Sequence, residues 1–157
     1  MTIDGIWSAH LEYIELREKC ESQMQIEVCN GCDSCWLRCS DGVQADAAEW
    51  DALQSYQCNL DSSEAEALTQ VLNQDKEVDM GDGVSVTMCR FFDMNSRKCS
   101  VYPARPLVCR LLGHVEWMPC PIEKIESVIN TPDALALLGV YSKRQRRTFD
   151  EWEAIKR

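Results

Sequence analysis

Apolar residues recur at helical spacing along most of the chain and alternate with polar residues in only one short stretch. Near the start, Trp7, Leu11 and Ile14 fall on one helical face, and glutamates fill the positions between them. This pattern predicts a first helix from about Asp4 to Ile26. Further helices are predicted at 46–58, 63–72, 106–112, 121–130, 131–141 and 148–155.

Two of these helix starts carry the signature of a capping box. Asp46 precedes Glu49 and Thr148 precedes Glu151, each by three residues, and the segment Ser63–Glu66 is predicted to open another helix. In such a pair, each side chain accepts a backbone N–H that the first helical turn leaves free.

The alternating stretch begins at Val84 and runs to Phe92, which predicts a short strand. Residues 93–98 read as a turn, and 99–102 as a second strand that closes a small hairpin. The acidic stretch 75–82 ends in Gly-Asp-Gly and is predicted to be a loop. The expected fold is therefore mainly α with a small β-hairpin.

Length and composition predict one compact domain organised by metal. The chain has 157 residues, and its apolar and charged fractions of 45% and 27% are ordinary for a globular protein. We expect a single domain over 1–157, with a cysteine-rich core at about 29–121 and flanking helices at 4–26 and 121–157.

Charge is distributed unevenly along the chain. Residues 1–82 hold 18 acids and 4 bases, whereas 83–157 hold 8 acids and 12 bases. The acidic half argues against nucleic-acid binding and is predicted to be a docking face for a basic protein partner. The basic run 143–147 is expected to complement the dipole at a helix C-terminus.

Cysteine content changes the picture most. Ten cysteines occur, although the first residues lack the basic and apolar segments of a signal peptide. No apolar run is long enough to span a membrane. We therefore expect a cytoplasmic chain without membrane association, where reduced cysteines more often bind metal than form disulfides.

Four of the cysteines lie within eleven residues, at Cys29, Cys32, Cys35 and Cys39. Their spacing matches the iron–sulfur run of bacterial ferredoxins, although Ser40 stands where those proteins have proline. Short gaps let several thiolates reach one metal centre without ordering a long loop.

Four more cysteines follow at nearly even spacing, at Cys89, Cys99, Cys109 and Cys120. Four thiolates satisfy either a tetrahedral zinc ion or an iron–sulfur cluster. The eight predicted ligands could serve two mononuclear sites, two clusters, or one cluster with spare thiols. The remaining pair, Cys20 and Cys58, is expected to be structural and buried.

The second group has a more specific context. It contains the motifs Cys99-Ser-Val-Tyr, Arg105-Pro-Leu-Val-Cys-Arg110 and Trp117-Met-Pro-Cys-Pro. With the first run, these motifs resemble the YkgJ-type cysteine-cluster family, known by the signature CxxCxxCC and described as zinc- or iron-chelating. The resemblance covers roughly residues 29–121 and implies that Cys29, Cys32 and Cys35 are ligands.

One position departs from the family pattern. Family members end the first run in two adjacent cysteines, whereas this chain has Trp36 there and Cys39 three residues later. Cys39 is therefore a ligand candidate on its ferredoxin-like spacing alone. Which sulfurs share a metal is left open.

Two arginines flank Cys109. Arg105 and Arg110 could donate to metal-bound sulfurs or offset the negative charge of nearby thiolates. They could equally pair with Asp93 or other acids. His114, between Cys109 and Cys120, is a secondary candidate ligand. The sequence contains no recognisable catalytic constellation, so an enzyme is not expected, although an accessory role beside a redox enzyme stays possible.

These observations favour an iron–sulfur protein, with a [4Fe–4S] cluster as the first choice, for electron transfer or redox sensing. The alternative is a structural zinc module that serves as an interaction or metal-handling scaffold. Under either hypothesis we expect a protein redox partner or a client protein.

Overall fold

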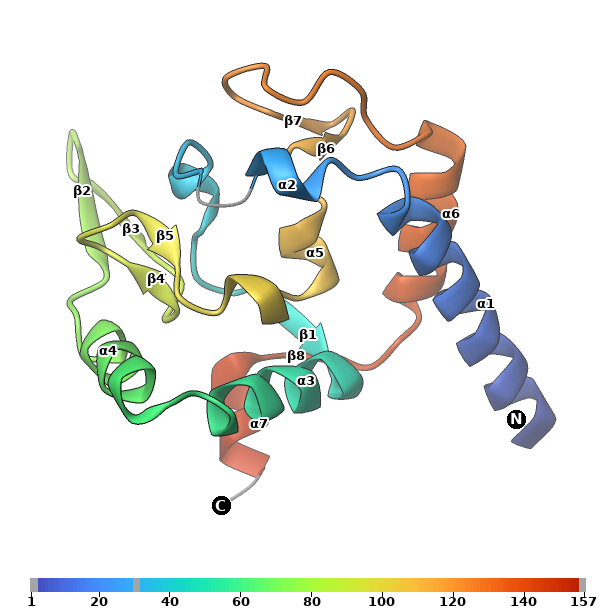
Figure 1. Cartoon of the computed structure of the whole chain (residues 1–157), viewed down its shortest axis with the longest axis horizontal. Coiled ribbons are helices and arrows are strands. Elements are labelled where there is room, and N and C mark those ends of the chain that lie inside the picture. The colour runs from blue at the N-terminus through green and yellow to red at the C-terminus, as the bar shows by residue number, and fades with distance from the viewer. Residues whose placement is uncertain (1–2, 30–31, 156–157) are drawn as a thin grey trace. The chain divides into compact units, whose positions relative to one another are not determined.

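The structure is a computed structural model that describes residues 3–29 and 32–155 (Figure 1). Contacts along the chain divide it into two compact units. Unit 1 combines residues 1–30 with 111–145, and unit 2 combines 31–110 with 146–157. Each unit has its own helices, hairpins and buried residues, and the single domain expected from chain length stays a prediction.

Unit 1 is built on two helices, α1 (Ile3–Glu21) and α6 (Thr131–Ser142), which pack side by side (Figure 1). The rings of Tyr13 and Tyr141 stack at 6.1 Å between these helices. Cys20 is fully buried, which confirms its predicted structural place. The burial of these apolar groups holds the two helices together.

The first helix ends at Glu21, earlier than the predicted Ile26. The Ser22 hydroxyl and the Gln23 amide both donate to the Lys19 carbonyl, at 2.7 and 3.1 Å. These side chains occupy the acceptor that the next helical N–H would need, so the helix stops there. A four-residue helix, α2 (Ile26–Cys29), follows.

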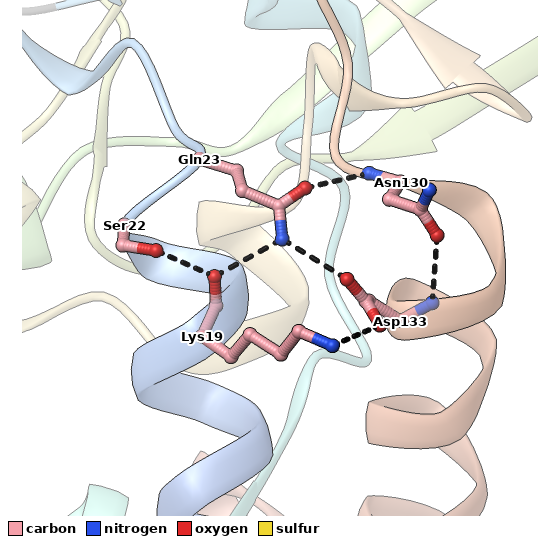
Figure 2. Close-up of polar contacts among 5 residues, drawn as sticks. All are labelled: Lys19, Ser22, Gln23, Asn130 and Asp133. Carbon is pink, nitrogen blue, oxygen red and sulfur yellow. Dashed lines mark hydrogen bonds and ion pairs between the residues drawn. The ribbon is translucent and has the colours of Figure 1, made fainter.

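Gln23 also joins the end of α1 to the start of α6, as Figure 2 shows. Its side-chain oxygen accepts the Asn130 N–H at 2.8 Å, and its amide nitrogen donates to Asp133 at 3.2 Å. The Lys19 ammonium approaches the same carboxylate at 2.7 Å. Asn130 caps α6 by accepting the Asp133 N–H, so the helix begins where the sequence predicted.

The third part of unit 1 is a short antiparallel hairpin of β6 (His114–Val115) and β7 (Met118–Pro119). The helix predicted at 121–130 is wrong, because the described residues 120–130 contain no helix. The Glu123 N–H donates to the Cys120 carbonyl at 3.3 Å, and the Ile129 N–H donates to the His114 carbonyl at 2.8 Å. A helix would need those donors for its own bonds.

Unit 2 carries most of the remaining helical structure. Its helices are α3 (Ala47–Cys58), α4 (Ser62–Leu72), α5 (Leu107–Arg110) and α7 (Phe149–Ile155), with 3-10 turns η1 (Trp36–Arg38) and η2 (Tyr102–Ala104). The helix predicted at 106–112 is thus reduced to the single turn α5, and Pro103 lies in η2 beyond a shortened strand.

Capping chemistry decides where these helices begin. Asp46 and Glu49 form the predicted capping box, and Thr148 and Glu151 exchange hydrogen bonds at the start of α7 as expected. The helix predicted to open at Ser63 begins one residue earlier, at Ser62. Asp61 caps α4 there, in a capping box with Glu64.

The core of unit 2 is aromatic. The ring of Phe149 meets Phe91 edge-on at 5.2 Å and stacks with Trp50 at 6.1 Å. Phe91 and Phe92 are buried, as the sequence predicted. The same cluster includes Ala45, Leu53, Leu68 and Val101, and Cys89 and Cys99 pack against it.

Strands in unit 2 form small antiparallel pairs. They are β1 (Gln44–Asp46) with β8 (Arg146–Thr148), β2 (Glu77–Gly81) with β3 (Val84–Thr87), and β4 (Phe92–Asp93) with β5 (Lys98–Cys99). The predicted hairpin around 93–98 is therefore present but short, with Phe92 opposite Cys99. The fold matches the mainly α prediction only roughly, because strands are spread over several small sheets.

Two further expectations are corrected by these strands. The stretch 75–82, predicted to be a loop, contains β2, because Gly81, Asp82 and Gly83 all adopt positive φ and close a hairpin. The basic run 143–147 lies at a helix C-terminus only at its start, where Lys143 is the C-cap of α6. α6 stops at Ser142, and Arg146 and Arg147 belong to β8.

In the part of the chain that the structure describes, no helix is both long and apolar enough to cross a bilayer.

Candidate metal centre

Four cysteines of unit 2 influence one another electrostatically although they come from separate segments. Cys39 follows η1, Cys89 precedes β4, Cys99 ends β5 and Cys109 lies in α5. The Cys89 N–H donates to the Cys39 carbonyl at 2.7 Å, which joins the first run to the first cysteine of the second group. The structure thus gathers one cysteine of the first run with three of the second group.

Burial and mutual charge both oppose ionisation of these thiols. Burial first, and then neighbouring thiols, raise the pKa of Cys39 to about 11 and that of Cys99 to about 12. The pKa of Cys109 is raised still further by the same causes, and burial raises that of Cys89. Such a set can become thiolate together only if a bound cation compensates its charge.

Arg105 is the cation whose charge acts on most of these thiols. Its charge lowers the pKa of Cys39, Cys99 and Cys109, against the larger effect of burial. The guanidinium lies 3.5 Å from the centre of the Tyr102 ring, and its Nε donates to the Tyr102 carbonyl at 3.1 Å. Arg105 is therefore held in place beside the thiols by contacts with its own loop.

Arg110 has a different part in the same segment. Its Nε donates to the Arg105 carbonyl at 2.8 Å, and its Nη2 donates to the Pro103 carbonyl at 3.0 Å. These contacts fold the backbone around Arg105. Asp93, the alternative partner for either arginine, accepts hydrogen bonds from Gln74 and Ser96.

The other cysteines of the first run divide between the two units. Cys32 and Cys35 lie in the half-buried loop before η1, and the charge of Cys35 contributes to the raised pKa of Cys39. Cys29 ends α2 and belongs to unit 1, together with Cys120. The run therefore does not behave as one self-contained ligand set within either unit.

In unit 1, His114 lies beside Cys29. The imidazole Nε2 is 3.9 Å from the Cys29 sulfur, and the ring is almost fully buried. The sequence placed His114 only as a secondary candidate, and its position between two cysteines was the one signal for it. The structure places its Nε2 beside the sulfur of a predicted ligand.

Cys120 has an environment opposite to that of the unit 2 thiols. Burial would raise its pKa, but the backbone N–H groups of residues 122–125, whose dipoles favour a negative charge on the sulfur, hold the pKa below the ordinary value. A sulfur surrounded by backbone donors is stabilised as the thiolate, the form that binds metal.

The donor set was tested against the metals that the sequence predicts. Among residues 3–29 and 32–155, no three His, Cys, Asp or Glu side chains converge closely enough to hold one ion. The chemistry of the donors fits nonetheless, since buried thiols beside an arginine suit zinc or an iron–sulfur cluster. Cys39, Cys89, Cys99 and Cys109 would hold such a group in unit 2.

The two remaining cysteines lie apart from this chemistry. Cys20 is buried between α1 and α6, as expected. Cys58 is exposed at the end of α3, so its predicted burial is wrong. Its place at the solvent-facing end of the helix, rather than on the face toward Leu53, accounts for the difference.

Comparison with known proteins identifies a family for the cysteine-rich region. A family model described as "CxxCxxCC: Putative zinc- or iron-chelating domain" matches residues 28–133, more than half of the chain. The match includes all eight predicted ligands and His114. No curated protein and no solved structure matched the chain.

Proposed function

Because the chain belongs to the CxxCxxCC family of zinc- or iron-chelating domains, we propose that its thiols hold an iron–sulfur cluster for electron transfer or redox sensing. The chain is a cysteine-rich metal-binding protein in either version of its chemistry. A [4Fe–4S] cluster takes four thiolate ligands, and when bound it accepts and releases single electrons.

The observation that carries this proposal is the group of four thiols in unit 2. Neighbouring thiols of the group, Cys89 among them, raise the pKa of Cys39, Cys99 and Cys109, and Arg105 acts on the same three. Four sulfurs with a nearby fixed cation match the all-thiolate ligation and negative charge of a cluster. Arg105 would stabilise the more reduced state, because that state carries more negative charge.

A structural zinc module is the second candidate, and one observation favours it. His114 lies 3.9 Å from Cys29, and mixed sulfur and nitrogen donors are typical of zinc. In that case the metal would stabilise the fold directly, and the protein would act as an interaction or metal-handling scaffold.

The decisive experiment is metal and sulfide analysis of protein purified without oxygen. We expect about four iron and four acid-labile sulfide per chain, with the visible absorbance of a cluster. Stoichiometric zinc in a colourless protein would support the scaffold instead. Protein without bound metal would overturn both.

A pair of variants connects the result to unit 2. Cys109→Ala should lose the iron and sulfide, because it removes one of the four thiols. Cys58→Ala is the matched control, since this cysteine is exposed and lies outside the thiol group. Equal iron in both variants would contradict the proposed ligand set.

A basic protein is the proposed redox partner, in the reducing cytoplasm where free thiols persist. Exposed acids follow one another along β2 and its turn, at Asp75, Glu77, Asp79 and Asp82. Opposite charge accelerates association and is screened by salt.

The partner proposal is tested by charge reversal. Replacing Glu77, Asp79 and Asp82 with lysine should slow reduction of a basic c-type cytochrome, used as a surrogate partner, about tenfold at low salt. Reversing Glu12, Glu15 and Glu18 on α1 is the control with the same charge change. Equal slowing in both variants would show that only net charge matters.

A further inference from the structure

We propose that His114 is a metal ligand and that its Nε2 shares an ion with the Cys29 sulfur. This inference deepens the proposed metal-binding function and rests on it. The site it describes takes a zinc-like divalent ion through mixed nitrogen and sulfur donors.

The first step concerns the protonation of the imidazole. His114 Nδ1 lies 3.2 Å from the Leu112 carbonyl oxygen. A carbonyl can only accept a hydrogen bond, so Nδ1 must carry the proton in that contact. In the neutral ring the lone pair is then on Nε2, the nitrogen that faces Cys29.

The second step is the distance between the two donor atoms. In a tetrahedral site with Zn–S and Zn–N bonds of ordinary length, the sulfur and nitrogen are separated by about 3.6 Å. The observed separation is 3.9 Å, close to that value. It is long for a hydrogen bond, so an S–H···N contact alone is a weaker account of the pair.

The third step is burial. Only 1% of the His114 surface is exposed, and an imidazole nitrogen taken out of water is costly unless it has a partner. The polar contact at Nε2 is the Cys29 sulfur, a poor hydrogen-bonding group. A metal ion between the two atoms would satisfy the nitrogen fully.

The backbone around His114 is fixed, as a ligand requires. Its N–H donates to the Leu111 carbonyl at 2.9 Å, and its carbonyl accepts the Ile129 N–H at 2.8 Å. Metal-binding histidines are commonly oriented by a hydrogen bond from the second ring nitrogen to a backbone carbonyl. The Leu112 contact supplies that bond here.

The backbone of a further predicted ligand, Cys120, lies next to the same hairpin. A methyl group added to Gly113 would touch Cα and Cβ of Cys120 at 3.8 Å, so Cys120 is adjacent to the residue before His114. Gly113 has φ of +85°, a conformation that side chains rarely adopt. The glycine thus lets the chain turn where His114 and Cys120 approach each other in the fold of unit 1.

The test uses cadmium as a probe of the ligands. Metal-free, reduced protein labelled with ¹⁵N-histidine is titrated with ¹¹³Cd, and the ¹¹³Cd spectrum is recorded. We expect a cadmium signal that couples to Nε2 of His114 and to no atom of His10. His10 is the control histidine, because its ring contacts Trp7 and Arg144 instead of a cysteine.

Two variants sharpen the test. His114→Ala should remove the coupled signal and lower the affinity of that site about 10- to 100-fold, whereas His10→Ala should change neither. His114→Cys restores a ligand, so it should recover the affinity while moving the cadmium resonance toward the all-sulfur range. Circular dichroism of each metal-free variant separates loss of ligation from loss of fold.

The outcomes distinguish this inference from the function on which it rests. Cadmium bound through sulfur alone, with no histidine coupling in the unsubstituted protein, overturns the role of His114 and leaves the metal-binding function intact. Failure of the protein to bind cadmium, zinc or iron overturns both. Because the coupling is measured in the unsubstituted protein, the result stands even if His114→Ala does not fold.

Discussion

The two units differ in what favours or opposes ionisation of their cysteine thiols. The thiol group of unit 2 can be compared with the region around Cys29, His114 and Cys120 in unit 1. In unit 2, burial raises the pKa of every member of the group; neighbouring thiols raise those of Cys39, Cys99 and Cys109 further, and Arg105 partly opposes them. In unit 1, backbone N–H groups lower the pKa of Cys120, and the His114 imidazole faces Cys29.

The difference shows that cysteines with the same spacing in sequence need not have the same chemistry. Buried thiols without donors depend on a metal cation to become thiolates. A sulfur that already accepts several N–H bonds is ionised more easily and needs the cation less. We therefore expect unit 2 to depend on metal for its stability more strongly than unit 1.

The largest expected effect is that of metal removal. Strong chelator with reductant should lower the free energy of unfolding of unit 2 by about 5 kcal/mol or more, because metal ligation contributes directly to folding. Tryptophan fluorescence of Trp50, in the unit 2 core, reports this unfolding. Hydrogen exchange in α1 and α6 should change less. Equal loss of protection in both units would show that unit 2 does not depend on metal more strongly than unit 1.

The next effect concerns the anchor of α5, the helix that carries Cys109. Glu49 is buried, and its two carboxylate oxygens accept the Leu107 N–H at 2.6 Å and the Asp46 N–H at 2.9 Å. Glu49→Ala should cost about 2–3 kcal/mol, measured by chemical denaturation, since it leaves buried donors unpaired.

Glu64→Ala is the matched control for Glu49. Glu64 makes the same capping contact at the start of α4, but on the surface. It should cost about 1 kcal/mol and leave metal affinity unchanged. If Glu49→Ala weakens metal binding no more than Glu64→Ala, then α5 does not need this anchor to present Cys109.

A smaller effect is the order in which the thiols of the metal-free protein react with iodoacetamide. Cys120 should be alkylated at least about tenfold faster than Cys39 and Cys99 at neutral pH, because its pKa is lowered and theirs are about 11 and about 12. As pH falls, the thiolate of Cys120 persists longest. As pH rises, the unit 2 thiols gain reactivity last.

Peptide mapping by mass spectrometry measures this order, with exposed Cys58 as the reference for an ordinary thiol. Equal rates for Cys120 and the unit 2 thiols would remove the electrostatic contrast between the two regions.

The smallest effect is expected at the ion pair between α1 and α6. Lys19 contacts Asp133 at 2.7 Å but is well exposed, so water and salt weaken the attraction. Lys19→Ala should lower the melting temperature slightly at low salt and not at high salt. Lys98→Ala is the control for loss of an exposed lysine. A large, salt-independent change would show that the pair holds unit 1 together.

Local signals in the sequence were sufficient for several features of the fold. The capping boxes at Asp46 and Thr148 and the start of α6 were predicted correctly, because each depends on side chains within four residues of one another. Burial of Cys20 and Phe91 also followed from apolar periodicity. The family resemblance followed from spacing along the chain and is confirmed by the family match.

Features that depend on distant or unusual backbone bonds were missed. Residues 121–130 have the apolar spacing of a helix, but the Glu123 N–H donates to the Cys120 carbonyl and the Ile129 N–H to the His114 carbonyl. The strand β2 is polar and was read as a loop, because its pairing with β3 depends on three consecutive positive φ values. Apolar periodicity records neither kind of bond.

The sequence by itself determined that this chain is a cysteine-rich, metal-binding member of its family and which eight sulfurs are the candidates. Only the tertiary structure decided how they group. It brought Cys39 to Cys89, Cys99 and Cys109, and it placed His114 beside Cys29. The residue types identify the candidate ligands. Which sulfurs become neighbours depends on burial and on backbone hydrogen bonds between segments far apart in the chain.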